Sequence, residues 1–200
     1  MAEDVPIAIL AKAPLAGLAK TRLIPTLGAE GAAALQAKLV TRAAANASAA
    51  RTGPVTLWAT PDETHPLFKS LRQEFGLKLV RQPDGDLGER MHAALRNDRT
   101  LVIGTDCPAL TPDHLVLAAA MLRHHDAVVI PAEDGGYVLI GLRKPQPAIF
   151  SNMVWGTATV MDETRRRFRS LSLTWKELPA LWDVDTPDDF ARLHKEKLLG

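Results

Sequence analysis

The 200-residue sequence has a single cysteine, Cys107, few aromatic residues and almost no net charge. One cysteine excludes an intramolecular disulfide and a zinc site built from several cysteines, and it suits a protein of a reducing compartment. The net charge of +1 at pH 7 excludes the broad basic surface that nucleic acids and anionic membranes attract. No apolar run reaches the roughly 18 residues of a membrane span, and acids stand near the start where a secretory signal carries positive charge. We therefore expect a cytoplasmic protein that binds neither nucleic acids nor membranes.

Apolar runs of strand length alternate with helical segments along the chain. This alternation predicts an α/β fold with three layers, αβα, around a mostly parallel, Rossmann-like sheet. The runs on either side of Glu133–Gly136 are too close for a helical crossover, so we expect one local antiparallel strand there. With no repeat and no linker, residues 1–200 are expected to form a single domain. Strands are predicted at 5–11, 55–60, 77–81, 100–104, 127–132, 136–142 and 171–178, and helices at 29–50, 66–75, 86–97 and 158–169 and from Thr111 and Thr186 onward.

Ionic side chains follow four of the predicted strands, at the ends where open α/β sheets bind ligands. Lysine and arginine hold phosphate oxygens, and Mg²⁺ or Mn²⁺ takes carboxylate oxygens. Cations in one loop and carboxylates in three others therefore predict a site for a metal-bound phosphate ligand. The residues are Lys12, Lys20 and Arg22 after the first strand, Asp106 after the fourth, Asp134 after the fifth, and Asp183 and Asp185 after the last.

Each of these signals has a structural alternative. The three loop cations fit solvated surface charges equally well, Asp86 fits a helix cap, and Asp106 fits a turn residue before Pro108. Asp183 and Asp185 point to the same side of an extended backbone, where two carboxylates repel unless they are solvated or bridged by a cation. The glycines of a P-loop, of a dinucleotide fingerprint and of a nucleophile elbow are missing, so these common sites are excluded.

Six motifs occur in the order AKAPLAGLAKTRL, GDLGERM, GTDCPAL, DGGYVLIGL, WGTATV and DVDTPDDF. Together, from Ile7 to Leu193, they resemble the bacterial GT-A type nucleotide-diphospho-sugar transferases known as selenodomain- or radical-SAM-associated glycosyltransferases. More distantly, the sequence is similar to phospholactate guanylyltransferases and molybdenum-cofactor nucleotidyltransferases. The resemblance implies a GT-A fold and a transferase that uses Mg²⁺ or Mn²⁺, a nucleotide (an NTP or an NDP-sugar) and a small-molecule acceptor.

The resemblance also implies roles for individual residues. Lys20, Asp106 and Asp134 would be catalytic, and Asp106 and Asp185 would hold the metal, with Asp183 as the alternative second ligand. The implied nucleotide- and phosphate-binding residues are Ala11, Lys12, Lys20, Thr21, Arg22, Asp86 and Arg90, and the implied acceptor-binding residues are Asp134, Gly135, Gly136, Trp155 and Thr157, with Gly156 between the last two.

Two transfer reactions fit this set of residues. In nucleotidyl transfer, an acceptor attacks the α-phosphorus of an NTP while Lys20 and Arg22 stabilise the departing pyrophosphate. In glycosyl transfer, an acceptor attacks the sugar carbon of an NDP-sugar while the metal stabilises the departing diphosphate. A nucleotide-binding module without catalysis and a nucleotide hydrolase are the alternatives. The base, sugar, acceptor and oligomeric state stay open.

Overall fold

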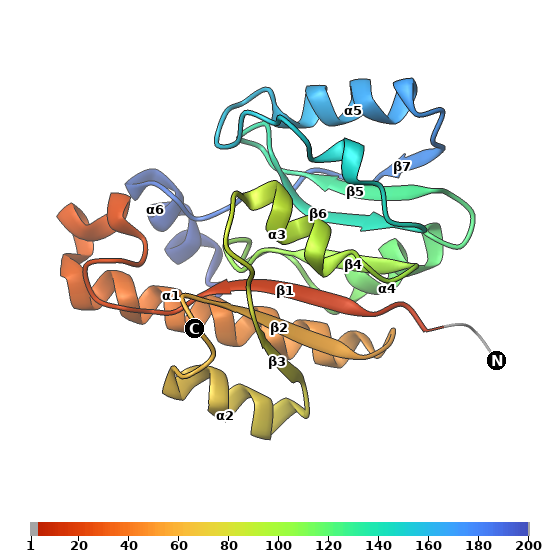
Figure 1. The fold of residues 1–200 in the computed structure, drawn as a ribbon. Helices are drawn as coiled ribbons and strands as arrows, with labels where there is room; N and C mark the ends of the chain where they lie inside the picture. The colour runs from red at the N-terminus through yellow and green to blue at the C-terminus, as the bar shows by residue number, and fades with distance from the viewer. Residues whose placement is uncertain (1–3, 200) are drawn as a thin grey trace.

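The computed structural model describes residues 4–199, which form a seven-stranded sheet with the strand order β3-β2-β1-β4-β6-β5-β7 (Figure 1). β6 is antiparallel to both of its neighbours, and all other neighbouring strands are parallel. The mostly parallel sheet with one local antiparallel strand is therefore confirmed. The strands are β1 (Ile7–Lys12), β2 (Val55–Thr60), β3 (Lys78–Arg81), β4 (Thr100–Ile103), β5 (Ala127–Pro131), β6 (Tyr137–Leu142) and β7 (Trp175–Glu177).

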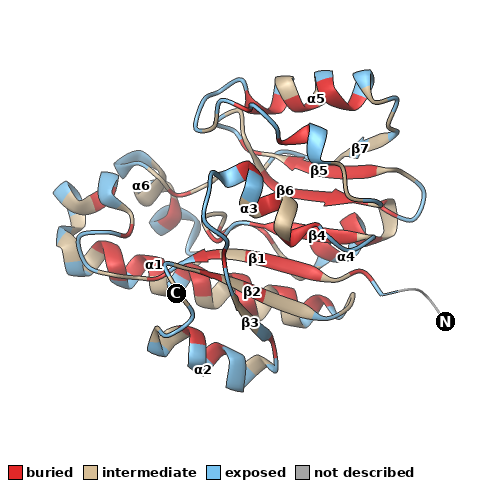
Figure 2. Cartoon of the chain, viewed as in Figure 1, coloured by how far each residue is buried: buried red, intermediate tan, exposed pale blue. Residues whose placement is uncertain are grey.

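Helices cover both faces of the sheet, as the three-layer prediction requires (Figure 1). On one face, Val40, Phe68 and Leu115 from three helices pack on the sheet. On the other face, Met91 and Phe168 do so, and the buried residues concentrate in the central strands (Figure 2). The helices are α1 (Ile24–Ala50), α2 (Pro66–Phe75), α3 (Leu87–Ala94), α4 (Pro112–Met121), α5 (Val160–Ser170) and α6 (Pro187–Glu196), with short 3₁₀ helices η1 (Thr21–Leu23) and η2 (Pro147–Ile149).

Most element boundaries agree with the sequence prediction to within three residues, and α1 and β7 differ by more. α1 begins at Ile24 rather than Ala29, because Pro25 fits the first turn of a helix and the chain continues through a kink at Gly28, whose φ is +70°. β7 spans only Trp175–Glu177 of the predicted 171–178, since the chain turns at Ser172, with φ +54°, between α5 and β7. Both differences lie outside the predicted site.

Capping boxes fix the beginnings of the helices that follow strands on the ligand side of the sheet. Asp86 and Glu89 each accept the other's backbone N–H at the start of α3, and Thr186 and Asp189 do the same at the start of α6. The predicted caps are confirmed, and they set where each connecting loop ends. Among residues 4–199, no helix combines the length and the apolar character that crossing a bilayer requires.

The strand order reverses direction at β1. From β1 the chain proceeds to β2 and β3 on one side, and it then returns to place β4 on the other side. At such a switch point the loops that follow the two central strands diverge and leave a crevice at their carboxyl ends. The loop after β4 is hydrogen-bonded to the loop between β7 and α6, because the Val184 N–H donates to the Asp106 carbonyl at 2.9 Å.

Candidate active-site cleft

A cleft of about 470 Å³ lies at the carboxyl ends of β1 and β4, at the switch point of the sheet. Its ionic wall contains seven of the residues that the sequence places at the site: Lys12, Lys20, Thr21, Arg22, Asp106, Asp183 and Asp185. Its apolar wall includes Leu10, Met91 and Ile140, and two exposed leucines, Leu18 and Leu87, also line the cleft. The cleft is therefore lined by a group of ionic residues, called its ionic half below, and by a group of apolar residues.

Lys20 lies at the centre of the ionic half. Its Nζ is 2.7 Å from Asp106 Oδ1 and 3.0 Å from Asp185 Oδ1, and it donates to the Val184 carbonyl at 2.7 Å. The side chain is only 5% exposed. Burial alone would lower the pKa of Lys20, but the two carboxylates outweigh burial and raise the pKa. Lys20 is therefore a buried cation held by residues from two distant loops.

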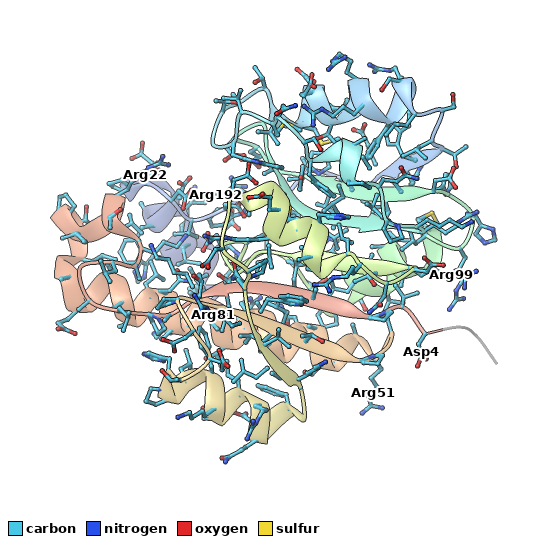
Figure 3. All side chains as sticks on the ribbon, viewed as in Figure 1. Asp4, Arg22, Arg51, Arg81, Arg99 and Arg192 are labelled. Atoms are coloured by element: carbon cyan, nitrogen blue, oxygen red, sulfur yellow. The ribbon has the colours of Figure 1, made fainter. Side chains whose placement is uncertain are left out.

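The rim of the cleft carries the other two predicted cations. Lys12 is exposed at the end of β1. Arg22 reaches into solvent with 74% of its side chain exposed and lies 3.8 Å from Asp185 Oδ2 (Figure 3). The structure thus brings all three predicted cations to one cleft, one of them buried and two accessible to an incoming anion.

Asp183, which the sequence leaves as the alternative second metal ligand, also belongs to this ionic half. Burial raises the pKa of its carboxyl to about 7, and the negative charges of Asp106, Asp134 and Asp185 act in the same direction. Lys20 opposes the shift. The spacing of Asp183 and Asp185, with one residue between them, is the signal from which the sequence predicted that both carboxylates face the same side.

Two buried glutamines that the sequence reasoning missed support the walls of the cleft. Gln36 of α1 donates to Thr105 Oγ1 at 3.2 Å and to the Lys12 carbonyl at 3.5 Å. Gln82, which follows β3, donates to the Trp58 carbonyl at 2.8 Å and the Ala11 carbonyl at 3.3 Å. Because buried amides require partners, these side chains fix the ends of β1, β2 and β4 relative to one another. A polar residue within the apolar pattern of α1 was the available signal for Gln36.

Three predicted nucleotide-binding residues lie outside the lining of the cleft. Ala11 is buried in β1, and Gln82 donates to its carbonyl. Asp86 accepts the Glu89 backbone N–H at 2.9 Å as the cap of α3, and Arg90 donates to the Gly85 carbonyl at 3.1 Å. Asp86 therefore does act as a cap, and the nucleotide-binding role of these residues stays a prediction.

The predicted acceptor residues lie in two other segments, the turn between β5 and β6 and the loop before α5. Asp134 Oδ1 accepts the Gly136 N–H at 2.9 Å, and Gly135 packs so closely on Ala158 that an added methyl group would overlap its backbone. Trp155 packs on α3 next to Gly88, and Thr157 donates to the Val154 carbonyl at 3.0 Å. None of these residues is among those that line the cleft, although the charge of the Asp134 carboxylate helps to raise the pKa of Asp183. Their acceptor-binding role stays a prediction.

Asp106 and Asp185 are the predicted metal ligands. Carboxylate oxygens are the donors that Mg²⁺ and Mn²⁺ prefer, so the chemistry of the pair fits. Among residues 4–199, however, no group of three or more histidine, cysteine, aspartate or glutamate side chains is arranged to hold a metal ion. The Lys20 ammonium lies between the two carboxylates. A divalent cation here would need further oxygen ligands from outside the protein, such as phosphate.

Comparisons with known proteins agree with this architecture. A candidate nucleotide-diphospho-sugar transferase from Desulfovibrio desulfuricans G20 is 31% identical with a TM-score of 0.87, over 96% of this chain and 87% of that chain. At the level of fold alone, the chain is similar to 4-diphosphocytidyl-2C-methyl-D-erythritol synthase from Anaerococcus prevotii, at 13% identity and a TM-score of 0.62 over 96% and 99% of the two chains.

A manganese complex of a Mycobacterium tuberculosis H37Rv protein also shares the fold, at 17% identity and a TM-score of 0.50 over 95% and 98% of the two chains. No curated protein matches the chain. The sequence pattern of the bacterial family described as "Uncharacterized protein conserved in bacteria (DUF2064)" matches residues 42–157, more than half of the chain. The protein therefore belongs to the DUF2064 family and has the fold of the nucleotide-diphospho-sugar transferases.

Proposed function

We propose that the protein is a divalent-metal-dependent transferase that uses a nucleotide substrate. The observation that carries this proposal is the meeting of three cations with three aspartates in one cleft, at the switch point of an α/β sheet. Unrelated surface charges would be scattered over the protein, whereas these charges come together from loops after three strands, β1, β4 and β7. The similarity to a candidate nucleotide-diphospho-sugar transferase at 31% identity supports the same reaction class.

The cations provide binding energy for phosphates. A cation about 4 Å from a phosphate charge gains about 4 kcal/mol at an effective dielectric constant of 20, before desolvation is subtracted. Lys12 and Arg22 are accessible to an incoming phosphate, whereas Lys20 is buried against its carboxylates. Thr21 adds a backbone and a hydroxyl donor between Lys20 and Arg22.

Asp106 and Asp185 would hold Mg²⁺ or Mn²⁺ together with the phosphate oxygens of the substrate. When bound, such an ion stabilises the negative charge that develops on the departing phosphate. The Gln36–Thr105 hydrogen bond holds the residue before Asp106, and the Val184–Asp106 backbone hydrogen bond holds the loop of Asp185 beside it. The manganese complex of a protein with the same fold supports the choice of metal.

Nucleotidyl transfer is the reaction that the cation-rich first loop favours. An acceptor oxygen attacks the α-phosphorus of an NTP, the bond from that phosphorus to the β-phosphate oxygen breaks, and pyrophosphate leaves with its charge next to Lys20 and Arg22. The shared fold with an enzyme whose name specifies a diphosphocytidyl product supports this assignment. Glycosyl transfer from an NDP-sugar is the second candidate, which the name of the Desulfovibrio protein favours.

The remaining assignments complete the proposal. Asp134–Gly136 and Trp155–Thr157 would form the acceptor side, with Asp134 next to the acidic end of the cleft. The described residues share one sheet, which supports a single domain. A cytoplasmic location stays a prediction that the lone cysteine supports.

Thermal denaturation of the protein with a panel of NTPs and NDP-sugars, each with and without Mg²⁺ or Mn²⁺, tests the proposal. A ligand at a hundredfold excess over its Kd raises the stability by about 2.7 kcal/mol. We expect a metal-dependent shift with at least one nucleotide and a smaller shift for Asp106→Asn. For the ligand found, release of pyrophosphate indicates nucleotidyl transfer, and release of a nucleoside diphosphate indicates glycosyl transfer.

Three results contradict the proposal. If no nucleotide gives a metal-dependent shift in the thermal denaturation, the protein is not a metal-dependent transferase that uses a nucleotide. Binding without any transfer to a panel of alcohols and sugar phosphates would indicate a nucleotide-binding module. Nucleotide cleavage that needs only water would indicate a hydrolase.

A further inference from the structure

Lys20 has no N–H left for a phosphate. Its ammonium carries three donors, and three acceptors surround it: Asp106 Oδ1, Asp185 Oδ1 and the Val184 carbonyl. With 5% of the side chain exposed, water has little access to these contacts. A phosphate that binds Lys20 must therefore draw the ammonium away from at least one present partner.

The same ammonium lies where a divalent cation would lie. It contacts one oxygen of each predicted metal ligand, at N···O distances of 2.7 Å and 3.0 Å. Mg²⁺ binds carboxylate oxygens at about 2.0–2.1 Å, so it would have to approach these oxygens more closely than the ammonium does. Two cations this close repel each other strongly. Lys20 and the metal therefore compete for Asp106 and Asp185.

The backbone of Lys20 has an uncommon, left-handed conformation. Its φ of +46° and ψ of +47° place a residue with a side chain in the left-handed region, which is uncommon outside glycine. Such a conformation persists only when surrounding contacts hold it. The three contacts of the ammonium and the hydrogen bond from Leu23 N–H to the Lys20 carbonyl, at 2.8 Å, are the contacts that hold it here.

We propose that Lys20 closes the divalent-cation site in the nucleotide-free protein and opens it when the phosphates of a nucleotide draw its ammonium away. Metal and nucleotide then enter together, and the metal-free protein keeps its carboxylates neutralised by its own cation. This inference rests on the proposed function. Within residues 4–199 the Lys12 ammonium makes no hydrogen bond or ion pair, so Lys12 and the exposed Arg22 are the first cations that a phosphate meets.

Binding of Mn²⁺ to the nucleotide-free, full-length protein, followed by electron paramagnetic resonance, tests the first half of this inference. We expect weak binding to the wild type and about tenfold tighter binding to Lys20→Met, a change within the usual range of coupling between two ligands. Lys12→Met is the matched control, because it removes the same charge from the same loop without a contact to Asp106 or Asp185. We expect it to change the affinity for Mn²⁺ little.

Three outcomes overturn the role of Lys20 in closing the site. The wild type binds Mn²⁺ as tightly as Lys20→Met, neither protein binds Mn²⁺, or Lys12→Met tightens binding as much as Lys20→Met does. If Lys20→Met does not fold, Lys20→Gln provides the same comparison, because its amide keeps an N–H donor but no charge.

A second arm repeats the titration with a nonhydrolysable nucleoside triphosphate, using the free nucleotide–manganese complex as the blank. We expect the nucleotide to raise the affinity of the wild type for Mn²⁺ about tenfold and that of Lys20→Met much less. A wild type that binds no nucleotide contradicts the proposed function. Nucleotide binding that raises both affinities equally contradicts only the proposed role of Lys20.

Discussion

The Nζ of Lys20 lies 2.7 Å from Oδ1 of Asp106, although the two residues follow different strands, β1 and β4. This ion pair joins the cation-rich first loop to the first carboxylate of the cleft. Their contact exists because β4 lies directly beside β1 in the sheet. The electrostatics of the proposed site therefore depend on the strand order.

We predict that Asp106→Asn lowers the turnover of the proposed transfer by about a hundredfold or more, because a preorganised charge in the reaction centre is lost. Asp188→Asn is the matched control, since Asp188 is an exposed acid in the first turn of α6 and lies outside the cleft. It should retain full activity and lose only a few tenths of a kcal/mol of stability. Initial-rate kinetics of both variants check this, and equal losses would argue against a specific role of Asp106.

Arg167 is predicted to be essential for holding the segment before the WGTATV motif. Its guanidinium donates to the carbonyls of Ile149 at 2.8 Å and Ser151 at 2.7 Å, and its Nε donates to Glu163 at 2.6 Å. Only 11% of its side chain is exposed, so Arg167→Met leaves several buried acceptors unpaired. We expect a loss of about 3 kcal/mol in the free energy of unfolding, measured with urea.

The neighbouring arginine supplies the control for this substitution. Arg166 pairs with the same Glu163 carboxylate at 2.6 Å but is 67% exposed. Arg166→Met should therefore cost less than about 1 kcal/mol, as exposed ion pairs do. If both variants lose the same stability, the carbonyl contacts of Arg167 do not stabilise the fold as argued.

Gly135 is predicted to tolerate no side chain. Its φ is +92°, and a methyl group there would overlap the backbone of Ala158, so Gly135→Ala should cost about 2–4 kcal/mol of stability. Gly17 also has a positive φ, +79°, but nothing lies within 4 Å of an added methyl group. Gly17→Ala should therefore cost only about 1 kcal/mol. Urea unfolding of the two variants separates steric overlap from backbone strain, and a similar cost for both would refute the overlap.

The Cys107 thiol is predicted to be unreactive in the folded protein. Burial, followed by the nearby Asp183 charge, raises its pKa from 9.0 to about 12, so almost no thiolate exists at pH 8. Because the folded-state pKa is the higher one, the contribution of this thiol to stability is complete below about pH 9 and declines above it. A thiol-specific chromogenic reagent at pH 8 should react with the folded protein far more slowly than with the urea-unfolded chain. Equal rates would contradict the raised pKa of the partly buried Cys107 thiol.

Much of the fold could be predicted because its determinants are local. Apolar runs of strand length, alternating with capped helices, predicted the parallel sheet and its one antiparallel strand. The helix caps at Asp86, Thr111 and Thr186 depend on residues only three positions apart, so the sequence displays them directly. The start of α1 was wrong by five residues, because Pro25 reads equally well as a loop residue and as a first-turn residue.

The site could be predicted only as a set of residue types after strand ends. Lys20, Arg22, Asp106 and Asp185 do meet in the cleft, as the predicted sheet requires. Trp155 and Thr157 do not line it, because the close packing of Gly135 on Ala158 and of Gly88 on Trp155 directs that segment toward α3. Gln36 stands out in the sequence only as a polar residue within an apolar helix pattern, and Gln82 has no such signal. Their roles depend on partners far away in the chain, Thr105 and Ala11.

The sequence by itself determined the family, the alternation of strands and helices, and the charged residues at the strand ends, because side-chain period and capping act over a few residues. Only the tertiary structure decided that the buried ammonium of Lys20 lies between Asp106 and Asp185. It also decided that Asp183 lies close enough for the charges of these two aspartates to raise its pKa. Such contacts depend on which strands are neighbours and on how far each side chain is removed from water. Both are properties of the packed sheet and of no single segment.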